Sequence, residues 1–162
     1  MTIDCSVRAV ALADAHELAA LHAGCFADSW SPQSMVDVLQ APGTFGFVAE
    51  MPDAPLIGLA LARVAVDDAE LLTVGIEPGW RRGGIARRLV VAVMREARTR
   101  GAKRLFLEVA EDNRAARALY ETESFRIVGR RRAYYVKLGG LPTDALTMRR
   151  ELVRGWTQWF AR

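Results

Sequence analysis

Two periods of apolar residues alternate along the chain, one typical of strands and one typical of helices. Short alternating or continuous apolar runs predict strands at residues 7–12, 44–50, 56–66 and 69–76. Turn residues separate the last three runs, so these strands should form an antiparallel meander. Two helices should precede the meander: one that Asp14 caps and that runs to about Phe26, and one that begins at Pro32 with Ser31 as its N-cap.

The second half of the chain continues this alternation. The spacing of apolar residues predicts an amphipathic helix from about Ile85 to Arg100, which Gly101 ends. A shorter helix is expected at residues 113–122 with Asp112 as its N-cap, and further strands are expected at residues 104–109, 125–129 and 146–151. This order of elements indicates an α/β (α+β) fold in one domain, residues 1–152, followed by a short aromatic helix or tail at residues 153–162.

Composition and charge narrow the class of protein. The net charge is only +3, from 22 basic and 19 acidic residues, so we expect no direct binding to nucleic acid. No apolar run reaches the roughly 18 residues of a membrane span, and the N-terminal segment does not read as a secretory signal. Cys5 and Cys25 lack the spacing of zinc ligands, so no metal is expected. We therefore expect a cytoplasmic protein that does not contact membranes.

A glycine-rich loop joins the strand that ends at Ile76 to the helix that begins at Ile85. A helix N-terminus carries free N–H groups and the positive end of the helix dipole, so it favours a phosphate. Gly83 and Gly84 would let the backbone approach such a ligand, and positive charge would come from Arg81, Arg82, Arg87 and Arg88. An ordinary loop whose glycines only turn the chain fits these residues equally well. The GxxxxGKS/T and GxGxxG patterns of nucleotide sites are absent.

The segment Arg81-Arg82-Gly83-Gly84-Ile85-Ala86 resembles the Q/R-x-x-G-x-G/A signature of the GNAT superfamily of acetyl-coenzyme A transferases. The resemblance implies a mixed, mostly antiparallel twisted sheet of six to seven strands with about four helices. In that fold one strand, here residues 73–76, splays away at a bulge and pairs with the pantetheine arm of acetyl-coenzyme A. The implied coenzyme contacts are the six residues of the signature together with Val74, Gly75, Ile76, Asn113 and Tyr120.

Further pieces of sequence, spread over roughly residues 7–152, resemble the ribosomal-protein-alanine N-acetyltransferases (RimI-type) within this superfamily. These pieces are Phe26, Trp30-Ser31, Glu70, Gly75-Ile76, Leu107-Glu108-Val109, Asn113, Leu119-Tyr120, Tyr134-Tyr135 and Asp144-Ala145. The resemblance implies direct transfer of an acetyl group to a primary amine, above all the N-terminal α-amine of a protein such as a ribosomal protein. The chain departs from the family at Glu123-Ser124-Phe125, where Leu-Gly-Phe is usual, and this implies either left-handed strain at Ser124 or a shifted helix cap.

The resemblance also implies the roles of individual residues. Glu108, an acid in an otherwise apolar strand, would accept the proton of the amine, directly or through a water, and Tyr120 would protonate the leaving thiolate. Asn113 would be an N-cap, a coenzyme ligand or both. The acceptor would be bound by Trp30, Glu70, Tyr134 and Tyr135.

Other interpretations stay open from the residues alone. Glu108 could form a salt bridge to a nearby arginine, and Tyr120 could be a half-buried packing residue. Asp67 and Asp68 could face the amine or form a solvated turn. Tyr134 and Tyr135 could be surface aromatics of a strand. His16 and His22 are expected to be structural.

The function and the assembly also have alternatives. The chain could acetylate a small amine or a lysine side chain, or it could bind acyl-coenzyme A without catalysis. The aromatic residues Trp156, Trp159 and Phe160 would either dock on the domain itself or form a dimer contact, so we expect a monomer or a weak homodimer.

Overall fold

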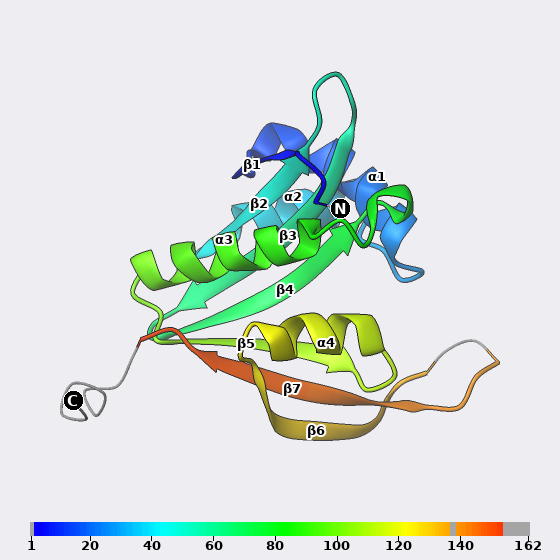
Figure 1. Ribbon diagram of the computed structural model, residues 1–162, viewed down its shortest axis with the longest axis vertical. Coiled ribbons are helices and arrows are strands. Elements are labelled where there is room, and N and C mark those ends of the chain that lie inside the picture. Colours follow the sequence, from blue (N-terminus) through cyan, green and yellow to red (C-terminus); the bar gives the residue numbers. More distant parts are fainter. Residues whose placement is uncertain (1, 137–138, 154–162) are drawn as a thin grey trace.

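The computed structural model describes residues 2–136 and 139–153, and within them the strands form a single sheet (Figure 1). Its order is β1-β2-β3-β4-β5-β7-β6. The strands are β1 (Ser6–Ala9), β2 (Thr44–Glu50), β3 (Leu56–Ala65), β4 (Asp68–Ile76), β5 (Arg104–Ala110), β6 (Arg126–Tyr135) and β7 (Thr143–Glu151). Neighbouring strands are antiparallel except β4 and β5, which are parallel. The expected mixed and mostly antiparallel sheet is confirmed.

Helices cover both faces of the sheet. The α-helices are α1 (Ala15–Cys25), α2 (Pro32–Gln40), α3 (Ile85–Thr99) and α4 (Arg114–Thr122), and single 3-10 turns lie at Leu12–Asp14 and Pro78–Trp80. Figure 1 shows α3 lying across β2, β3 and β4, and α4 on the same side above the second part of the sheet. Helices α1 and α2 pack on the opposite face.

The buried run of β3 explains how both faces are packed. Residues 56–62 are all buried, as the continuous apolar sequence predicts for a strand covered on both sides. Because side chains alternate between faces, Ala60 and Ala62 join the core beneath α3, whereas Leu59 and Leu61 join a second cluster beneath α1 and α2. The sheet is therefore the middle layer of three in this part of the molecule.

Helix capping follows the sequence at α2 and departs from it at α1. The Ser31 hydroxyl accepts the N–H of Ser34, as expected. Asp14 stands immediately before α1, but its carboxylate accepts the N–H of Ala11 and forms an ion pair with Arg8 at 2.9 Å. Asp14 is thus the N-cap residue of α1, as expected, but its side chain makes no cap hydrogen bond, because the guanidinium offers the carboxylate a stronger, charge-assisted one.

The N-cap of α4 also differs by one position from the expectation. Asn113, and not Asp112, precedes the helix, and its side-chain oxygen accepts the N–H of Ala116 at 3.2 Å. An amide can cap a helix as well as a carboxylate can, so the local sequence did not distinguish the two residues.

Several element boundaries in the structure differ from those predicted from the sequence. Strand β1 ends at Ala9, three residues before the expected end, because residues 12–14 form a 3-10 turn. Strands β6 and β7 are longer than expected, since β6 continues through its arginines to Tyr135. The aromatic residues Trp156, Trp159 and Phe160 lie outside the described residues. In the part of the chain that is described, no helix is long and apolar enough to cross a membrane.

Candidate active site

The glycine loop opens α3 in a way that suits a phosphate. Gly84 is the N-cap, with a φ of 79° in the left-handed region that favours glycine. A Cβ on Gly84 would meet no heavy atom of the described residues within 4 Å. Because Gly84 has no side chain to cap the helix, the first N–H groups of α3 remain available to a ligand.

Gly83 is explained by packing that the sequence did not suggest. A Cβ at this position would lie 2.1 Å from the Cδ1 atom of Ile3. The N–H of Ile3 also donates to the carbonyl oxygen of Gly83 at 3.2 Å. The glycine therefore makes room for the N-terminal segment, which braces the loop from one side.

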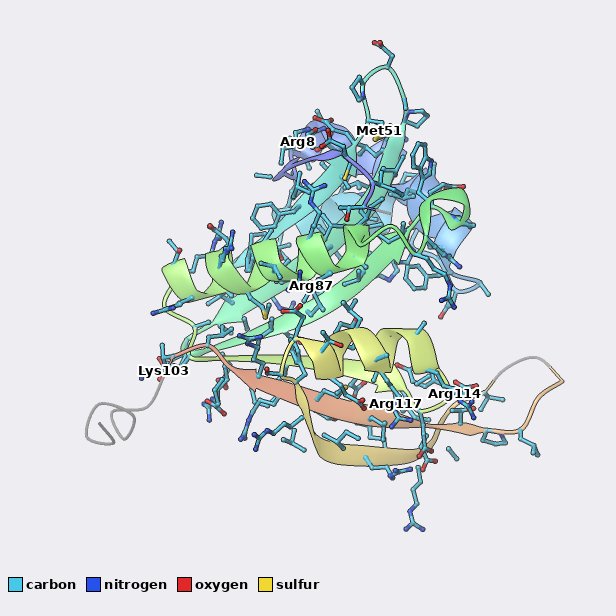
Figure 2. All side chains as sticks on the ribbon, in the orientation of Figure 1. Arg8, Met51, Arg87, Lys103, Arg114 and Arg117 are labelled. Carbon is cyan, nitrogen blue, oxygen red and sulfur yellow. The ribbon has the colours of Figure 1, made fainter. Side chains whose placement is uncertain are left out.

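The arginines of this region divide into two groups. Three of them hold the loop and helix in place. Arg81 donates to the carbonyl of Ile76 at 3.0 Å. Arg88 contacts the carbonyl of Ile3 and the sulfur of Cys5, and Arg87 pairs with Glu123 at 2.5 Å. Figure 2 shows Arg87 between α3 and α4, so this pair ties the two helices together. Arg82, with a φ of 64°, makes no hydrogen bond or ion pair to the described residues, and it is the arginine best placed to meet an anion.

Strands β4 and β5 separate beside this loop. They pair at residues 68–70 and 104–106, with Glu70 opposite Phe106, and then diverge, as Figure 1 shows. On its other side, β4 shifts register against β3 so that Leu72 has no partner. The bulge and the splay implied by the resemblance are thus confirmed. Beyond them, Val74, Gly75 and Ile76 stay paired with β3 on one side, while on the other side they have no pairing with β5 and border the gap.

Glu108 lies on β5 beyond the point of divergence. Its neighbours Leu107 and Val109 belong to the core beneath α3 and α4, so the Glu108 side chain points to the opposite face. It is 28% exposed, and its Oε1 atom lies 3.2 Å from the Nε atom of Arg131. The salt bridge that the sequence left open is therefore present, and it places an arginine between Glu108 and solvent.

Tyr134 and Tyr135 of β6 lie close to the carboxylate of Glu108 and to its partner Arg131. The Arg131 guanidinium lies 5.2 Å from the ring centre of Tyr134, which in turn meets Tyr135 edge to face at 5.2 Å. Burial raises the pKa of Tyr135, and the negative charge of Glu108 raises it further. A bulge near Ala133 sets these side chains, because Asp144 accepts the N–H of Ala133 at 2.8 Å and pairs with Arg130 at 2.9 Å.

Tyr120 lies on the face of the sheet opposite to the Glu108 side chain. It belongs to the same buried cluster as Ile76 and Ile85 and packs edge to face on Phe125 at 5.6 Å. Burial raises the pKa of Tyr120 to about 12, so its hydroxyl keeps its proton at neutral pH. Ser124 has the expected left-handed conformation, with a φ of 65°, and it turns the chain from α4 toward Phe125.

The expected acceptor residues are brought together only in part. Trp30 lies in the loop between α1 and α2, stacked on the ring of His22. Glu70 sits at the base of the splay, half-exposed, with Arg63 at 3.8 Å. Asp67 and Asp68 are elsewhere, since they pair with Lys103 and Arg104 at the joined end of β4 and β5. For these two aspartates the solvated turn is the correct interpretation.

Three residues near the site were not among the sequence candidates for a role in it: His22, Arg131 and Glu123. His22 was expected to be structural only, yet both ring nitrogens have close polar contacts. Arg131 was one of three consecutive arginines, and nothing local marked it as the partner of Glu108. Glu123 was noted only as a departure from the family, although its carboxylate is held by Arg87 and Arg150. Its burial beside a splayed pair of strands could not be read from the local pattern.

Comparisons with known proteins agree with this geometry. The profile of the acetyltransferase (GNAT) family matches residues 15–125. N-alpha-acetyltransferase RimI of Mycobacterium tuberculosis is 36% identical over 152 residues, which cover 90% of this chain and 92% of that protein. The ribosomal protein bS18-alanine N-acetyltransferase of Salmonella typhimurium is 36% identical over 96 residues, covering 59% of this chain and 64% of that protein.

Solved structures lead to the same family. The crystal structure of the ribosomal-protein-S18-alanine N-acetyltransferase from Escherichia coli has a TM-score of 0.82 and 25% identity, covering 94% of this chain and 96% of that one. Arabidopsis thaliana NAA60, in complex with a bisubstrate analogue, has a TM-score of 0.77 over 91% of this chain and 98% of that one; its 22% identity shows the fold alone. Fold, loop and profile together show that the chain belongs to the acetyltransferase (GNAT) family.

Proposed function

We propose that this enzyme transfers an acetyl group from acetyl-coenzyme A directly to the N-terminal α-amine of a protein, with Glu108 as the proton acceptor and Tyr120 as the proton donor. The observation that carries the proposal is the gap between β4 and β5, which Glu108 borders from one face of the sheet and Tyr120 from the other. The gap thus offers one side to an acceptor and the other to a coenzyme.

The residues present fit acetyl-coenzyme A. The open space at Gly84 and the free N–H groups of α3 suit a pyrophosphate, with Arg82 as the available cation. The backbone of Val74, Gly75 and Ile76 can hydrogen bond to an extended amide arm, and Ile85, Ala86 and Asn113 border the same region. When bound, the coenzyme supplies the acetyl group as a thioester.

The roles of the protein groups follow from their places. An N-terminal amine arrives as an ammonium, and Glu108 accepts the proton that must leave before the nitrogen can attack the carbonyl carbon. A backbone N–H of Gly75 or Ile76 stabilises the oxygen as it becomes negative. As the carbon–sulfur bond breaks, Tyr120 donates its proton to the sulfur. The nitrogen loses its second proton as it becomes an amide, and this proton restores the Tyr120 hydroxyl, whereas the proton held by Glu108 passes to solvent. Amide, free thiol and one proton for solvent then balance the reaction.

The named relatives support a protein N-terminus as acceptor. The Mycobacterium tuberculosis relative is named for N-alpha-acetylation, and others are named for the alanine of ribosomal protein bS18. Tyr134 and Tyr135 next to Glu108, Glu70 at the base of the gap and Trp30 in the loop after α1 would bind the first residues of the acceptor. A ribosomal protein as acceptor places the reaction in the cytoplasm.

An acetylation assay tests this proposal. Purified enzyme is given acetyl-coenzyme A with a panel of peptides that have free N-termini, beginning with alanine and with other residues, alongside N-terminally blocked lysine peptides and small amines. We expect the highest kcat/KM with a free N-terminal peptide. A preference for lysine or for a small amine would refute the acceptor, and coenzyme binding without any transfer would refute catalysis.

A further inference from the structure

His22 lies in the last turn of α1, outside the catalytic pair, and is only 3% exposed. Its Nδ1 atom is 3.1 Å from the backbone nitrogen of Trp30, and its Nε2 atom is 3.3 Å from the Oγ1 atom of Thr73. One buried imidazole therefore connects the loop that follows α1 with β4, 51 residues further along the chain.

The geometry determines the protonation of this ring. A backbone N–H can only donate, so Nδ1 must accept from Trp30 and cannot carry a proton. The proton of the neutral imidazole is then on Nε2, which donates to the Thr73 hydroxyl. Burial lowers the pKa of His22, although the carboxylate of Asp28 opposes this shift, so burial favours the neutral ring.

The loop on one side of His22 is wrapped around the imidazole. The ring of Trp30 stacks on it with centroids 4.7 Å apart and an interplanar angle of 19°, and the ring of Phe26 lies 4.5 Å away. Both aromatic side chains and the Trp30 backbone thus take their positions from one side chain. The loop lies on the α1 face of the sheet, the face to which the Glu108 side chain also points.

The strand on the other side of His22 borders the gap. Thr73 follows the Leu72 bulge directly and precedes the backbone segment proposed to meet the coenzyme. The end of α1 also packs closely there, since a Cβ on Gly75 would lie 3.1 Å from the sulfur of Cys25 and 3.2 Å from the ring of Phe26. Any displacement of β4 at this point is therefore transmitted to the loop.

We propose that His22 is a positioning residue that couples the acceptor loop at residues 26–30 to the coenzyme strand at Thr73. This inference rests on the proposed function, because it names the loop that orders the acceptor. The Nδ1 atom of the imidazole accepts the N–H of Trp30, and its Nε2 atom contacts the hydroxyl of Thr73, so the ring links the loop to the strand. Acceptor affinity should therefore depend on His22 much more than coenzyme affinity does.

Two substitutions separate hydrogen bonding from packing. His22→Phe keeps an aromatic ring but leaves the Trp30 N–H buried without an acceptor, whereas His22→Asn places an oxygen near the position of Nδ1. We expect His22→Phe to raise KM for the best N-terminal peptide by about tenfold, with kcat and the Kd of acetyl-coenzyme A within about twofold of the wild-type values. His22→Asn should restore most of the loss. Equal KM values for wild type and His22→Phe would overturn the proposal.

Nuclear magnetic resonance of the wild-type protein tests the coupling without turnover. The ¹⁵N shifts of His22 should show a protonated Nε2 and an accepting Nδ1, and titration with acetyl-coenzyme A should move the Trp30 amide resonance. In Thr73→Val, which removes only the strand contact, that movement should shrink. A pKa of His22 close to that of an exposed imidazole would contradict the coupling. So would a movement of the Trp30 amide resonance in Thr73→Val that is as large as in the wild type. These measurements do not need turnover, so they test the coupling even if no peptide is acetylated. The absence of acetylation would instead refute the proposed function.

Discussion

The two parts of the sheet, which separate at the gap between β4 and β5, are stabilised in different ways. The first part, β1 to β4, is covered by helices on both faces and buries a continuous apolar strand, β3. The second part has α4 on one face, and its edge strand β6 is exposed along nearly its whole length. Apolar packing therefore holds the first part, whereas charged and exposed side chains dominate the edge strand of the second part.

The second part has an apolar core on its α4 face and a series of charged pairs around it. Arg130 bridges Glu111 and Asp144, Arg131 meets Glu108, and Glu123 meets Arg87 and Arg150. Charges on β6 also protect an edge strand from pairing with another chain. Half-exposed ion pairs add little stability, so we infer that the edge of the second part, around β6, is less rigid than the first part.

The largest effect is expected at Glu108, on the polar side of the gap. Glu108→Gln keeps the shape of the side chain but cannot accept a proton, so kcat should fall by about 10²–10⁴-fold. The defect should shrink as pH rises, because more of the acceptor amine is then already neutral. Steady-state kinetics across pH measure both effects, and a defect that stays constant up to the pKa of the acceptor would indicate a binding role instead.

A similar loss is expected at Tyr120, which is buried in the core beneath α3 and α4. Tyr120→Phe removes the proton donor and should lower kcat by about 10²–10⁴-fold, while the Kd of acetyl-coenzyme A changes far less. Because the pKa of Tyr120 is raised to about 12, the phenol stays protonated through the usual assay range, and the defect should be the same at pH 7 and pH 9. Full kcat with the best acceptor would remove Tyr120 from the mechanism.

The phosphate site of the rigid part is tested by Gly84→Val. The branched side chain would fill the space at the start of α3, and we expect coenzyme affinity to fall at least about tenfold by calorimetry. Gly101→Val is the matched control, since Gly101 also has a positive φ, of 91°, and open space around it, but lies at the other end of α3. Equal losses in both variants would point to backbone strain and not to the site.

A smaller effect is expected from Asp144, which shapes β6 near the tyrosines. Asp144→Ala removes its bonds to Ala133 and Arg130, so the acceptor KM should rise by about three- to tenfold with little change in melting temperature. Glu151→Ala, which breaks the ion pair with Arg149 at the opposite end of β7, is the control and should leave KM unchanged. The acceptor side would be more rigid than we infer if the Asp144 variant also had normal KM.

The smallest effect is expected from the cysteines. Burial raises the pKa of the Cys25 thiol, and Cys5 is buried, so neither is prepared to attack a thioester. The double variant Cys5→Ala, Cys25→Ala should keep kcat within about threefold of the wild-type value, because transfer to the amine is direct. Mass spectrometry of the intact protein during turnover provides the check, and an acetylated cysteine would contradict direct transfer.

The sequence predicted the parts of this site that depend on residues close together in the chain. The order of elements, the cap at Ser31, the left-handed Ser124 and the glycine at the start of α3 all follow from rules that act over a few residues. Errors arose where a local rule had two solutions, as at Asp112 and Asn113. They also arose where a distant charge intervened, as when Arg8 drew Asp14 away from α1.

The tertiary structure alone decided which distant side chains meet. The sequence by itself indicated the family, the loop proposed to bind phosphate and the candidates Glu108 and Tyr120. It could not show that Arg131 lies on Glu108, that Arg87 holds Glu123, or that His22 reaches Thr73 across 51 residues. Such pairs depend on strand register and on where β4 leaves β5, and these are fixed by the packing of the whole sheet and not by any short segment.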